Sequence, residues 1–306
     1  MKESSEHKTL VIITGPTAVG KTQTSIEIAE KLQTEIISAD ARQFYKELRI
    51  GTAAPTPSEN QRVKHYLAGH LSVFDYYNAS LFEKDALKTI DKLFLTKDFV
   101  VVTGGSGLYI DTLCHGIDEM PDISEDIRNK AKEIYLNNGI EGLRFELKRI
   151  DPVYYDEVDK ANPNRMLRGI EIFYATGERF SDLRKKTRIK RPFQIKKIVL
   201  NLPRKELFSR INLRAHDMIR QGLVEEAIGF FKYRHLNALN TVGYKEIFAW
   251  YQNIWNLNTA IEKIKTNTRR YAKRQLTWFS RYDDARWFLP REEKQIMKLI
   301  KEKSRQ

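Results

Sequence analysis

The octapeptide at residues 15–22 constrains the fold of this chain more than any other stretch. It reads GPTAVGKT, with the spacing G-x-x-x-x-G-K-T, and it follows directly on the apolar run LVII at residues 10–13. In such a loop, backbone N–H groups surround a phosphate at the N-terminus of the following helix. We therefore predict a buried strand over residues 9–14, a phosphate-binding loop and an amphipathic helix over residues 21–32. The alternative is a glycine-rich turn with an incidental Lys-Thr pair.

Two further strands are predicted to end in residues that could take part in chemistry. Residues 35–40 (EIISAD) end in the carboxylate of Asp40, and residues 98–103 (DFVVVT) run into the loop GGSG at residues 104–107. Strands that alternate with helices form a parallel sheet whose carboxyl ends gather ligands, so both ends should lie beside the phosphate loop. Asp40 could orient Mg²⁺ through water, act as a general base or cap a helix. The GGSG loop is either a tight turn or a place where a ligand comes close.

The character of the sequence changes after about residue 113. Helical patterns then follow one another with no strand-like run between them, at residues 124–136, 139–150 and 164–176. Residues 196–203 read as another core strand, and the pattern beyond residue 204 is mainly helical. The predicted fold is α/β, a P-loop NTPase-like parallel sheet core with a helical insertion domain and a helical C-terminal region. The core would comprise residues 1–116 and 196–306, and the insertion residues 117–195.

The chain is strongly basic, and its charges are unevenly spread. It carries 53 Lys and Arg against 40 Asp and Glu, a net charge of +13. An excess of this size favours a polyanionic partner, because each neutralised phosphate releases counterions. Residues 184–197 (RKKTRIKRPFQIKK) contain no acid, and residues 263–282 interleave cations with Tyr271, Trp278 and Phe279. Either run alone is typical of a solvated helix face, but together they suit an RNA with unpaired bases.

Other features of the composition exclude several classes of protein. No apolar run reaches the roughly 18 residues of a membrane span. The N-terminus MKESSEHK is polar and lacks the apolar segment of a signal peptide. The single cysteine, Cys114, excludes an intrachain disulfide and a cysteine-based zinc site. We therefore expect a cytoplasmic protein with no membrane contact.

A set of motifs in order along the chain resembles the tRNA dimethylallyltransferase family, also called tRNA isopentenyltransferases. The motifs span about residue 10 to residue 288 and comprise GPTAVGKT, EIISADARQFY, IGTAAP, GGSGLYI, NPNRMLRGIEIFYATG, RINLRAHDMIRQGLVEEA, TVGYKEI and IKTNTRRYAKRQLTWF. The first is shared with many kinases, whereas the last three are particular to this family. The sequence shows no zinc-finger extension, which resembles the bacterial form. Ala41 stands where the family often has serine, and Ser106 where threonine is common.

The resemblance implies that the phosphate loop holds the diphosphate of dimethylallyl diphosphate rather than ATP. The dimethylallyl group would move to N6 of the adenosine immediately 3′ of the anticodon, with release of diphosphate. The implied cofactor is Mg²⁺. The implied partners are dimethylallyl diphosphate and the anticodon stem-loop of tRNA, which the helical insertion would grip, and the expected state is a monomer.

The resemblance also implies roles for individual residues. Asp40 would be the general base at the adenine amino group, Lys21 would neutralise the diphosphate, and Thr22 would hold Mg²⁺ or a phosphate oxygen. An arginine would reach over the leaving group, with Arg214 favoured and Arg210 as the alternative. The implied diphosphate-binding residues are Gly15, Pro16, Thr17, Ala18, Val19, Gly20, Lys21 and Thr22. The implied tRNA-binding residues are Asp40, Ala41, Arg42, Gln43, Ser106, Asn164, Arg165, Met166, Leu167, Arg168, Gly243, Tyr244 and Lys245.

Three other functions remain open from the sequence. An adenylate isopentenyltransferase would use the same donor on free AMP, ADP or ATP, but it needs neither the insertion nor the basic C-terminal helix. A small-molecule P-loop kinase gives no reason for the motif TVGYKEI. A non-catalytic RNA-binding protein gives no reason to keep Lys21, Thr22 and Asp40 together.

Overall fold

Two compact units make up the chain. The computed structural model describes residues 8–118, 120–185 and 188–302. The core unit consists of Met1–His115 and Lys190–Gln306, and the inserted unit consists of Gly116–Ile189. In the described part of the chain, no helix is long and apolar enough to cross a membrane.

The second boundary between the units lies before the expected one at residues 195/196. Arg191 already belongs to the core unit, because its guanidinium donates to the backbone carbonyls of Thr112 at 3.0 Å and Leu113 at 2.8 Å. The same guanidinium pairs with the carboxylate of Glu83, and both side chains are largely buried. Part of the acid-free basic run at residues 184–197 therefore serves the packing of the core.

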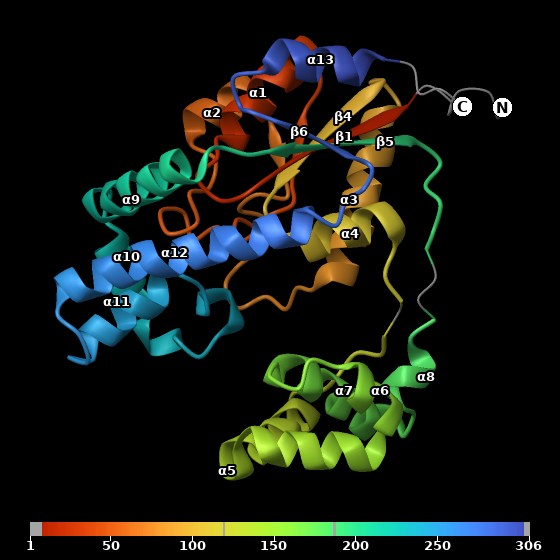
Figure 1. Ribbon diagram of the computed structural model, residues 1–306, viewed down its shortest axis with the longest axis vertical. Helices are drawn as coiled ribbons and strands as arrows, with labels where there is room; N and C mark the ends of the chain where they lie inside the picture. Colours follow the sequence, from red (N-terminus) through yellow and green to blue (C-terminus); the bar gives the residue numbers. More distant parts are fainter. Residues whose placement is uncertain (1–7, 119, 186–187, 303–306) are drawn as a thin grey trace. The chain divides into compact units, whose positions relative to one another are not determined.

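A six-stranded parallel sheet forms the centre of the core unit (Figure 1). The strands lie in the order β3-β2-β4-β1-β5-β6. Their bounds are β1 Thr9–Thr14, β2 Ile36–Ser38, β3 His65–Tyr66, β4 Phe99–Gly104, β5 Gln194–Leu200 and β6 Ala285–Phe288. Because β1 pairs with β4 and β5, and β4 pairs with β2, the carboxyl ends of the predicted strands meet at one edge. This confirms the predicted parallel α/β core.

The sheet differs from the sequence prediction at its margins. The predicted strand at residues 196–203 is shifted, because β5 pairs with β1 from Gln194 onward and ends at Leu200. The edge strands β3 and β6 were not predicted. β3 has only two residues, and β6 reads ARWF, a short segment with no alternation to distinguish it from a loop.

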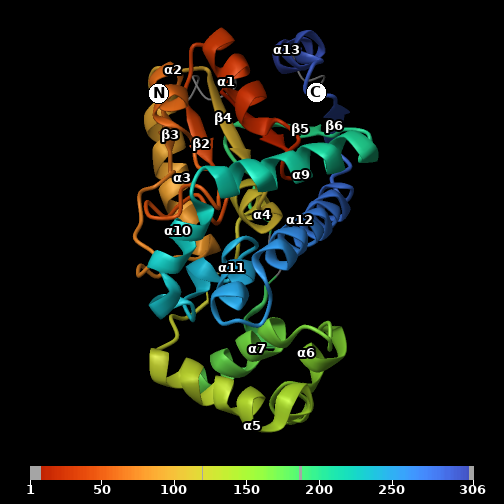
Figure 2. The same ribbon diagram turned by 90° about the vertical axis from the view of Figure 1, so that its left-hand side faces the viewer.

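Helices cover both faces of the sheet (Figure 2). Alternate residues of β1 point to opposite faces, as the two-residue period of a strand requires. Leu10 and Ile12 pack with α3 (Ala79–Phe94) and α4 (Gly107–His115). Val11 and Ile13 of β1 pack on the opposite face, which is covered by α1 (Lys21–Lys31), α9 (Arg204–Arg220) and α13 (Glu293–Lys301). The short helix α2 (Pro57–Arg62) precedes β3.

A third helical group follows α9 and surrounds the fully buried Tyr244. It comprises α10 (Leu223–Gly229), two 3-10 turns (Phe231–Tyr233 and Asn237–Leu239), α11 (Tyr244–Tyr251) and α12 (Leu257–Phe279). α12 connects this group to the sheet, because Ile264 packs with α10 and α11, whereas Ala272 and Phe279 pack on opposite faces of the sheet. The helix therefore runs along the strand-end loops.

The inserted unit is helical over its described residues. It contains α5 (Glu125–Ile150), α6 (Pro152–Glu157), α7 (Pro163–Thr176) and α8 (Phe180–Leu183). The two helices predicted at residues 124–136 and 139–150 are both present within α5 and are separated at Gly139, whose backbone is not helical (φ 62°, ψ −157°). Leu143 and Leu147 pack with Met166 and Ile170 of α7 in a separate hydrophobic core.

Candidate active site

The loop at residues 15–22 connects β1 to α1 and needs glycine where it begins. Gly15 has φ of 146°, and a Cβ there would lie 2.3 Å from the carbonyl oxygen of Leu200 on the neighbouring strand β5. Gly20, the residue before α1, has φ of 110°. Only glycine adopts such a backbone easily, and it lets the chain turn its N–H groups toward a bound anion.

Lys21 folds back over this loop. Its ammonium group donates to the carbonyl oxygens of Gly15 and Pro16, each at 2.9 Å. The pKa of Lys21 is lowered from 10.5 to about 8, mainly by burial; the carboxylate of Asp40 opposes this shift, and the charge of Arg214 adds a smaller lowering. A buried cation with a lowered pKa is suited to an anionic ligand, because the anion restores the protonated form.

The arginines of α9 lie on two sides of the phosphate loop. Arg210 donates to the carbonyl oxygen of Val19 at 3.3 Å and pairs with Glu206 at 3.0 Å. Arg214 instead lines a cavity that also contains Thr17 and Asp40. Burial lowers the pKa of Arg214, and Asp40 opposes this effect. The structure therefore distinguishes the two candidates by their contacts: Arg210 binds the loop backbone, and Arg214 faces the cavity.

Asp40 lies two residues beyond the end of β2, on the wall of this cavity of about 510 Å³. We call it the acceptor pocket. The carboxylate accepts the backbone N–H of Arg42 at 3.1 Å, which orients it at the start of a turn. Tyr271 of α12 also lines the pocket, and its pKa is raised by burial and by the charge of Asp40. The pocket thus joins a carboxylate, a guanidinium and a phenol at the carboxyl edge of the sheet.

The loop after β4 fixes the residues on either side of Asp40. A Cβ at Gly104 would lie 2.2 Å from the carbonyl oxygen of Ala39, so glycine allows the two strand ends to touch. Ser106 accepts the backbone N–H of Ala41 through its hydroxyl oxygen at 2.9 Å. The GGSG loop therefore makes a close approach to the chain around Asp40 and is more than a turn.

Comparison with known proteins identifies the family. The family model described as "IPP transferase" matches residues 43–282. The chain is 46% identical over 293 residues to "tRNA dimethylallyltransferase 1" of Bacteroides thetaiotaomicron, covering 96% of this chain and 95% of the relative. It is 48% identical over 287 residues to "tRNA dimethylallyltransferase 2" of Parabacteroides distasonis, covering 94% and 96%. The chain belongs to the tRNA dimethylallyltransferase family.

A solved structure agrees with this family. The crystal structure of the full-length tRNA isopentenylpyrophosphate transferase from Bacillus halodurans superimposes with a TM-score of 0.70 and 32% sequence identity. The match covers 96% of this chain and 95% of that protein. The likeness therefore extends over the core unit and the inserted unit alike.

Eleven of the thirteen residues assigned to tRNA by resemblance to the family lie in two places, the acceptor pocket and α7, whereas Gln43 and Tyr244 lie in neither. Those on the acceptor pocket are Asp40, Ala41, Arg42, Ser106, Gly243 and Lys245. Arg42 donates to the carbonyl oxygen of Asn237 at 2.7 Å, which ties the pocket wall to the turn before α11. Gln43 donates its amide to the carbonyl oxygen of Ala53 at 2.9 Å and accepts the hydroxyl of Ser38 at 3.1 Å, so its side chain braces the strand end.

The other assigned residues belong to α7 of the inserted unit, namely Asn164, Arg165, Met166, Leu167 and Arg168. Met166 is buried at 0% exposure, and so is Tyr244 in the core unit. The hydroxyl of Tyr244 donates to Glu226 at 2.6 Å. Both side chains are turned inward, and their assignment to tRNA stays a prediction. They are internal because each fills a hydrophobic core.

Several residues of the site were not singled out from the sequence. Asn267, Tyr271 and Arg274 of α12 line the acceptor pocket together with Glu246 of α11, and Gln275 bonds to the loops beside it. A signal for them exists, because positions 267, 271, 274 and 275 recur at the spacing of one helix face. In the sequence this stretch is evident as a basic run with aromatic residues and as the family motif IKTNTRRYAKRQLTWF, neither of which indicates which side chains face the pocket.

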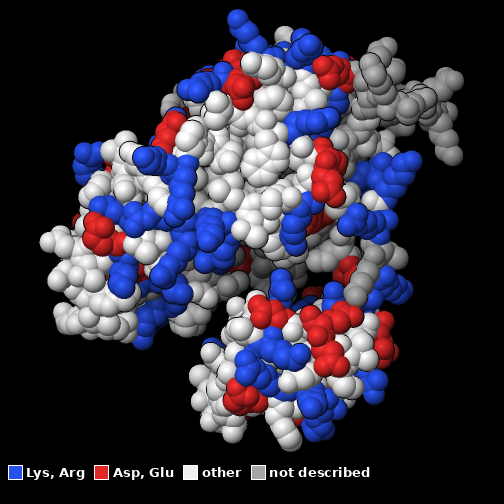
Figure 3. All heavy atoms as spheres, viewed as in Figure 1, with Lys and Arg blue, Asp and Glu red and all other residues white. Residues whose placement is uncertain are grey.

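Cations gather on the exposed side of α9 and α12. Figure 3 shows this concentration on the core unit. The exposed cationic residues of the two helices are Arg204, Lys205, Arg210, Arg220, Lys263, Arg270, Lys273 and Arg274. Four of them, Lys263, Arg270, Lys273 and Arg274, belong to the basic run with aromatic residues that the sequence shows at residues 263–282.

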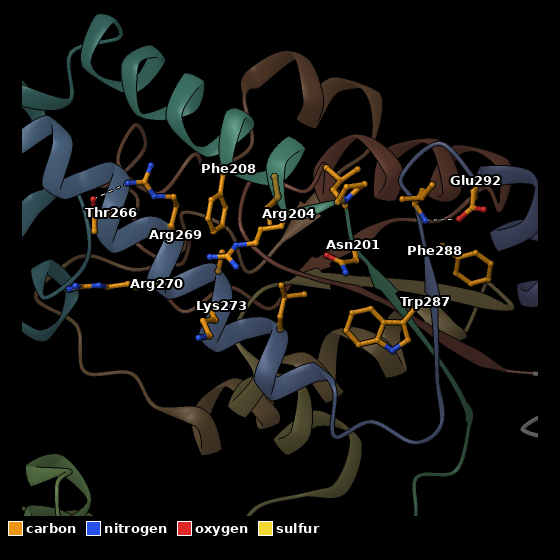
Figure 4. Close-up of a pocket in the computed structure, with 16 residues that line it drawn as sticks. Asn201, Arg204, Phe208, Thr266, Arg269, Arg270, Lys273, Trp287, Phe288 and Glu292 are labelled. Atoms are coloured by element: carbon orange, nitrogen blue, oxygen red, sulfur yellow. Dashed lines mark hydrogen bonds between the residues drawn. The ribbon is translucent and has the colours of Figure 1, made fainter.

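A second and larger cavity of about 880 Å³ lies against the same helices. Figure 4 shows Arg204 and Phe208 of α9, Arg269 and Lys273 of α12 and Trp287 of β6 around it. Among its described lining residues are none of those that the sequence predicted for the site. Several of the residues predicted for the site instead line the smaller acceptor pocket.

Proposed function

We propose that the core unit transfers the dimethylallyl group of dimethylallyl diphosphate to N6 of the adenosine immediately 3′ of the anticodon, with Asp40 as the general base. The observation that carries this assignment is the shared acceptor pocket. Asp40 and Arg214 line it together, and both influence the pKa of Lys21 in the adjoining phosphate loop. The proposed general base and the proposed site of the leaving diphosphate thus adjoin the same pocket.

The donor half of the reaction is the departure of diphosphate. Breaking the C–O bond of dimethylallyl diphosphate leaves negative charge on the phosphate oxygens, and preorganised cations and N–H groups stabilise such charge best. Lys21, the amides of residues 18–22 and Arg214 would supply them. Arg210, which holds the carbonyl of Val19, would shape the loop from the other side.

The acceptor half is the attack of the adenine N6 amino group on the allylic carbon. An aromatic amine is a poor nucleophile, so a carboxylate that removes its proton as the C–N bond forms lowers the barrier. Asp40 would take this proton. The adenine must leave its stack in the anticodon loop to enter the pocket, which Tyr271 and Arg42 line.

Mg²⁺ is expected at the diphosphate. This ion retains several waters and binds through phosphate oxygens and one or two protein ligands. Thr22, half-buried in the first turn of α1, provides one hydroxyl for such a site. Among the described residues, no group of three or more His, Cys, Asp or Glu side chains could hold a metal by itself, which fits an ion bound mainly by the substrate. When bound, Mg²⁺ would supply charge neutralisation to the leaving group.

The choice of tRNA over a free nucleotide rests on the inserted unit and the basic surface. A free adenine nucleotide needs only the acceptor pocket, whereas an anticodon stem-loop offers a row of phosphates to the exposed cations of α9 and α12. The residues on α7 would contact the same stem-loop. The alternative acceptor is therefore AMP, ADP or ATP.

The acceptor is tested by incubating the protein with Mg²⁺, dimethylallyl diphosphate and either unmodified tRNA or AMP. Mass spectrometry of the nucleosides then detects N6-dimethylallyl adenosine. We expect product on tRNA alone, its loss in Asp40→Ala, and wild-type product in Asp91→Ala, an exposed aspartate of α3. Product on AMP alone would assign the protein to the adenylate enzymes.

A further inference from the structure

Gln275 joins the phosphate loop to the loop after β4. Its side-chain N–H donates to the carbonyl oxygen of Gly105 at 2.8 Å, and its side-chain oxygen accepts the backbone N–H of Thr17 at 2.8 Å. The side chain belongs to α12 and is 5% exposed; its bond to Gly105 is buried, and its bond from Thr17 is partly buried. The helix thereby connects two loops that follow the neighbouring strands β1 and β4.

The fit between Gln275 and Gly105 is close. A Cβ at Gly105 would lie 2.2 Å from Nε2 of Gln275 and 3.6 Å from the ammonium nitrogen of Lys21. Gly105 is not one of the glycines with positive φ, so its backbone does not require glycine. The missing side chain instead makes room for the amide of Gln275.

The bridge reaches both halves of the reaction centre. On one side, Thr17 opens the turn that leads to Lys21. On the other side, Ser106 follows Gly105, accepts the N–H of Ala41 at 2.9 Å and donates its own N–H to the carbonyl of Ala39 at 3.4 Å. The residues before and after Asp40 are therefore held by the loop that Gln275 holds.

We propose that Gln275 is a positioning residue that fixes the diphosphate-binding loop relative to Asp40. This inference rests on the proposed function. Gln275 also accepts the backbone N–H of Thr17, so this N–H is not free to bind the diphosphate. The amides available to the diphosphate are then those from Ala18 onward, fewer than the predicted residues 15–22. Misplacement of reacting groups by about 1 Å can cost roughly 100-fold in rate, so a bridge between donor and base should act mainly on kcat.

Gln275→Met tests the bridge, because methionine keeps the length of the side chain and removes both polar groups. We expect kcat under saturating substrates to fall by about 10- to 100-fold, with the affinities for inorganic diphosphate and tRNA changed by less than about threefold. Thr277→Met, at an exposed position of the same helix, is the control and should keep the wild-type kcat. Thermal unfolding of each variant shows that it is folded.

Gln275→Glu supplies a second readout. A protonated carboxyl group can donate to Gly105 and accept from Thr17 as the amide does, whereas the ionised form loses the donor. The ratio of the variant's kcat to the wild-type kcat should therefore rise as the pH falls through the pKa of the new carboxyl group. The same ratio for Gln275→Met should not depend on pH.

Three results would overturn the inference: a wild-type kcat in Gln275→Met, a loss confined to KM for dimethylallyl diphosphate, or a pH-independent ratio in Gln275→Glu. These results are separable from a failure of the proposed function. If the wild-type enzyme modifies AMP and not tRNA, the acceptor assignment fails, and the same kcat ratios measured with AMP still test Gln275.

Discussion

At the scale of single residues, the site works through charges that are partly withdrawn from water. Lys21 and Arg214 have lowered pKa values because they are buried, and Asp40 counteracts the shift of each. In the free protein, the ammonium group of Lys21 donates hydrogen bonds to the carbonyl oxygens of Gly15 and Pro16. An arriving diphosphate would replace these weak partners with a full negative charge.

The lowered pKa of Lys21 predicts a pH dependence of diphosphate binding. The ammonium form binds the anion, and in the free enzyme this form is lost as the pH rises through about 8. Affinity for inorganic diphosphate should therefore be full below that pH and decline above it, with uptake of a proton on binding. Titration calorimetry over this pH range measures both quantities.

Lys21→Arg is the control for this prediction, because arginine stays charged over the whole range. Protonation of diphosphate itself affects both proteins equally, so the difference between them isolates Lys21. Parallel pH profiles in the wild type and Lys21→Arg would contradict the assigned shift.

At the scale of elements, one carboxylate of α10 holds a segment that lines the acceptor pocket. Glu226 of α10 accepts the backbone N–H groups of Arg49 at 3.0 Å, Ile50 at 2.9 Å and Gly51 at 2.9 Å. It also accepts the hydroxyl of Tyr244 of α11. The segment that carries Gly51 to the pocket is thus tied to two helices by a single side chain.

Removing this carboxylate should loosen the wall. Glu226→Ala leaves several donors, most of them partly buried, without a partner, so the free energy of unfolding should fall by about 2 kcal/mol, as measured by urea denaturation. KM for tRNA should rise because Gly51 lines the pocket. The exposed neighbour Glu225 provides the control, since Glu225→Ala removes the same charge without these bonds. Equal effects of the two substitutions would refute a specific role for Glu226.

At the scale of the whole molecule, the sequence predicts the centre of the fold better than its margins. Buried runs such as residues 9–14 and 98–103 carry strong strand signals, and the glycines after them mark the loops where the sites form. The edge strands β3 and β6 were not predicted, because strands of two and four residues depend on pairing with a neighbouring strand rather than on a local sequence pattern.

The site was predictable to a similar degree. The phosphate loop and Asp40 stand at strand ends, where a parallel sheet must bring them together. The roles of Gln275 and Tyr271 depend on which face α12 turns to the loops, and no spacing in the sequence alone decides that. Burial of Met166 and Tyr244 likewise depends on packing partners far along the chain.

Salt dependence tests the proposed binding of tRNA by the molecule as a whole. Lys245 and Arg274 line the acceptor pocket and are exposed. Replacing both by alanine should weaken tRNA binding. It should also reduce the magnitude of the slope of log affinity against log salt concentration by about 1 to 2, because fewer counterions are released on binding when two phosphate contacts are missing. Filter binding at several salt concentrations gives this slope. Lys88→Ala with Lys92→Ala, two exposed lysines of α3, should leave it unchanged.

The central claim is that Asp40 removes the proton from the adenine amino group during transfer. The most direct measurement is the single-turnover rate of Asp40→Asn with saturating dimethylallyl diphosphate and tRNA, beside its affinity for tRNA. Asparagine keeps the shape of the side chain and cannot accept the proton. We predict a rate at least about 100-fold below the wild type with tRNA affinity little changed. A near-wild-type rate, or a loss explained entirely by weaker tRNA binding, would contradict the account.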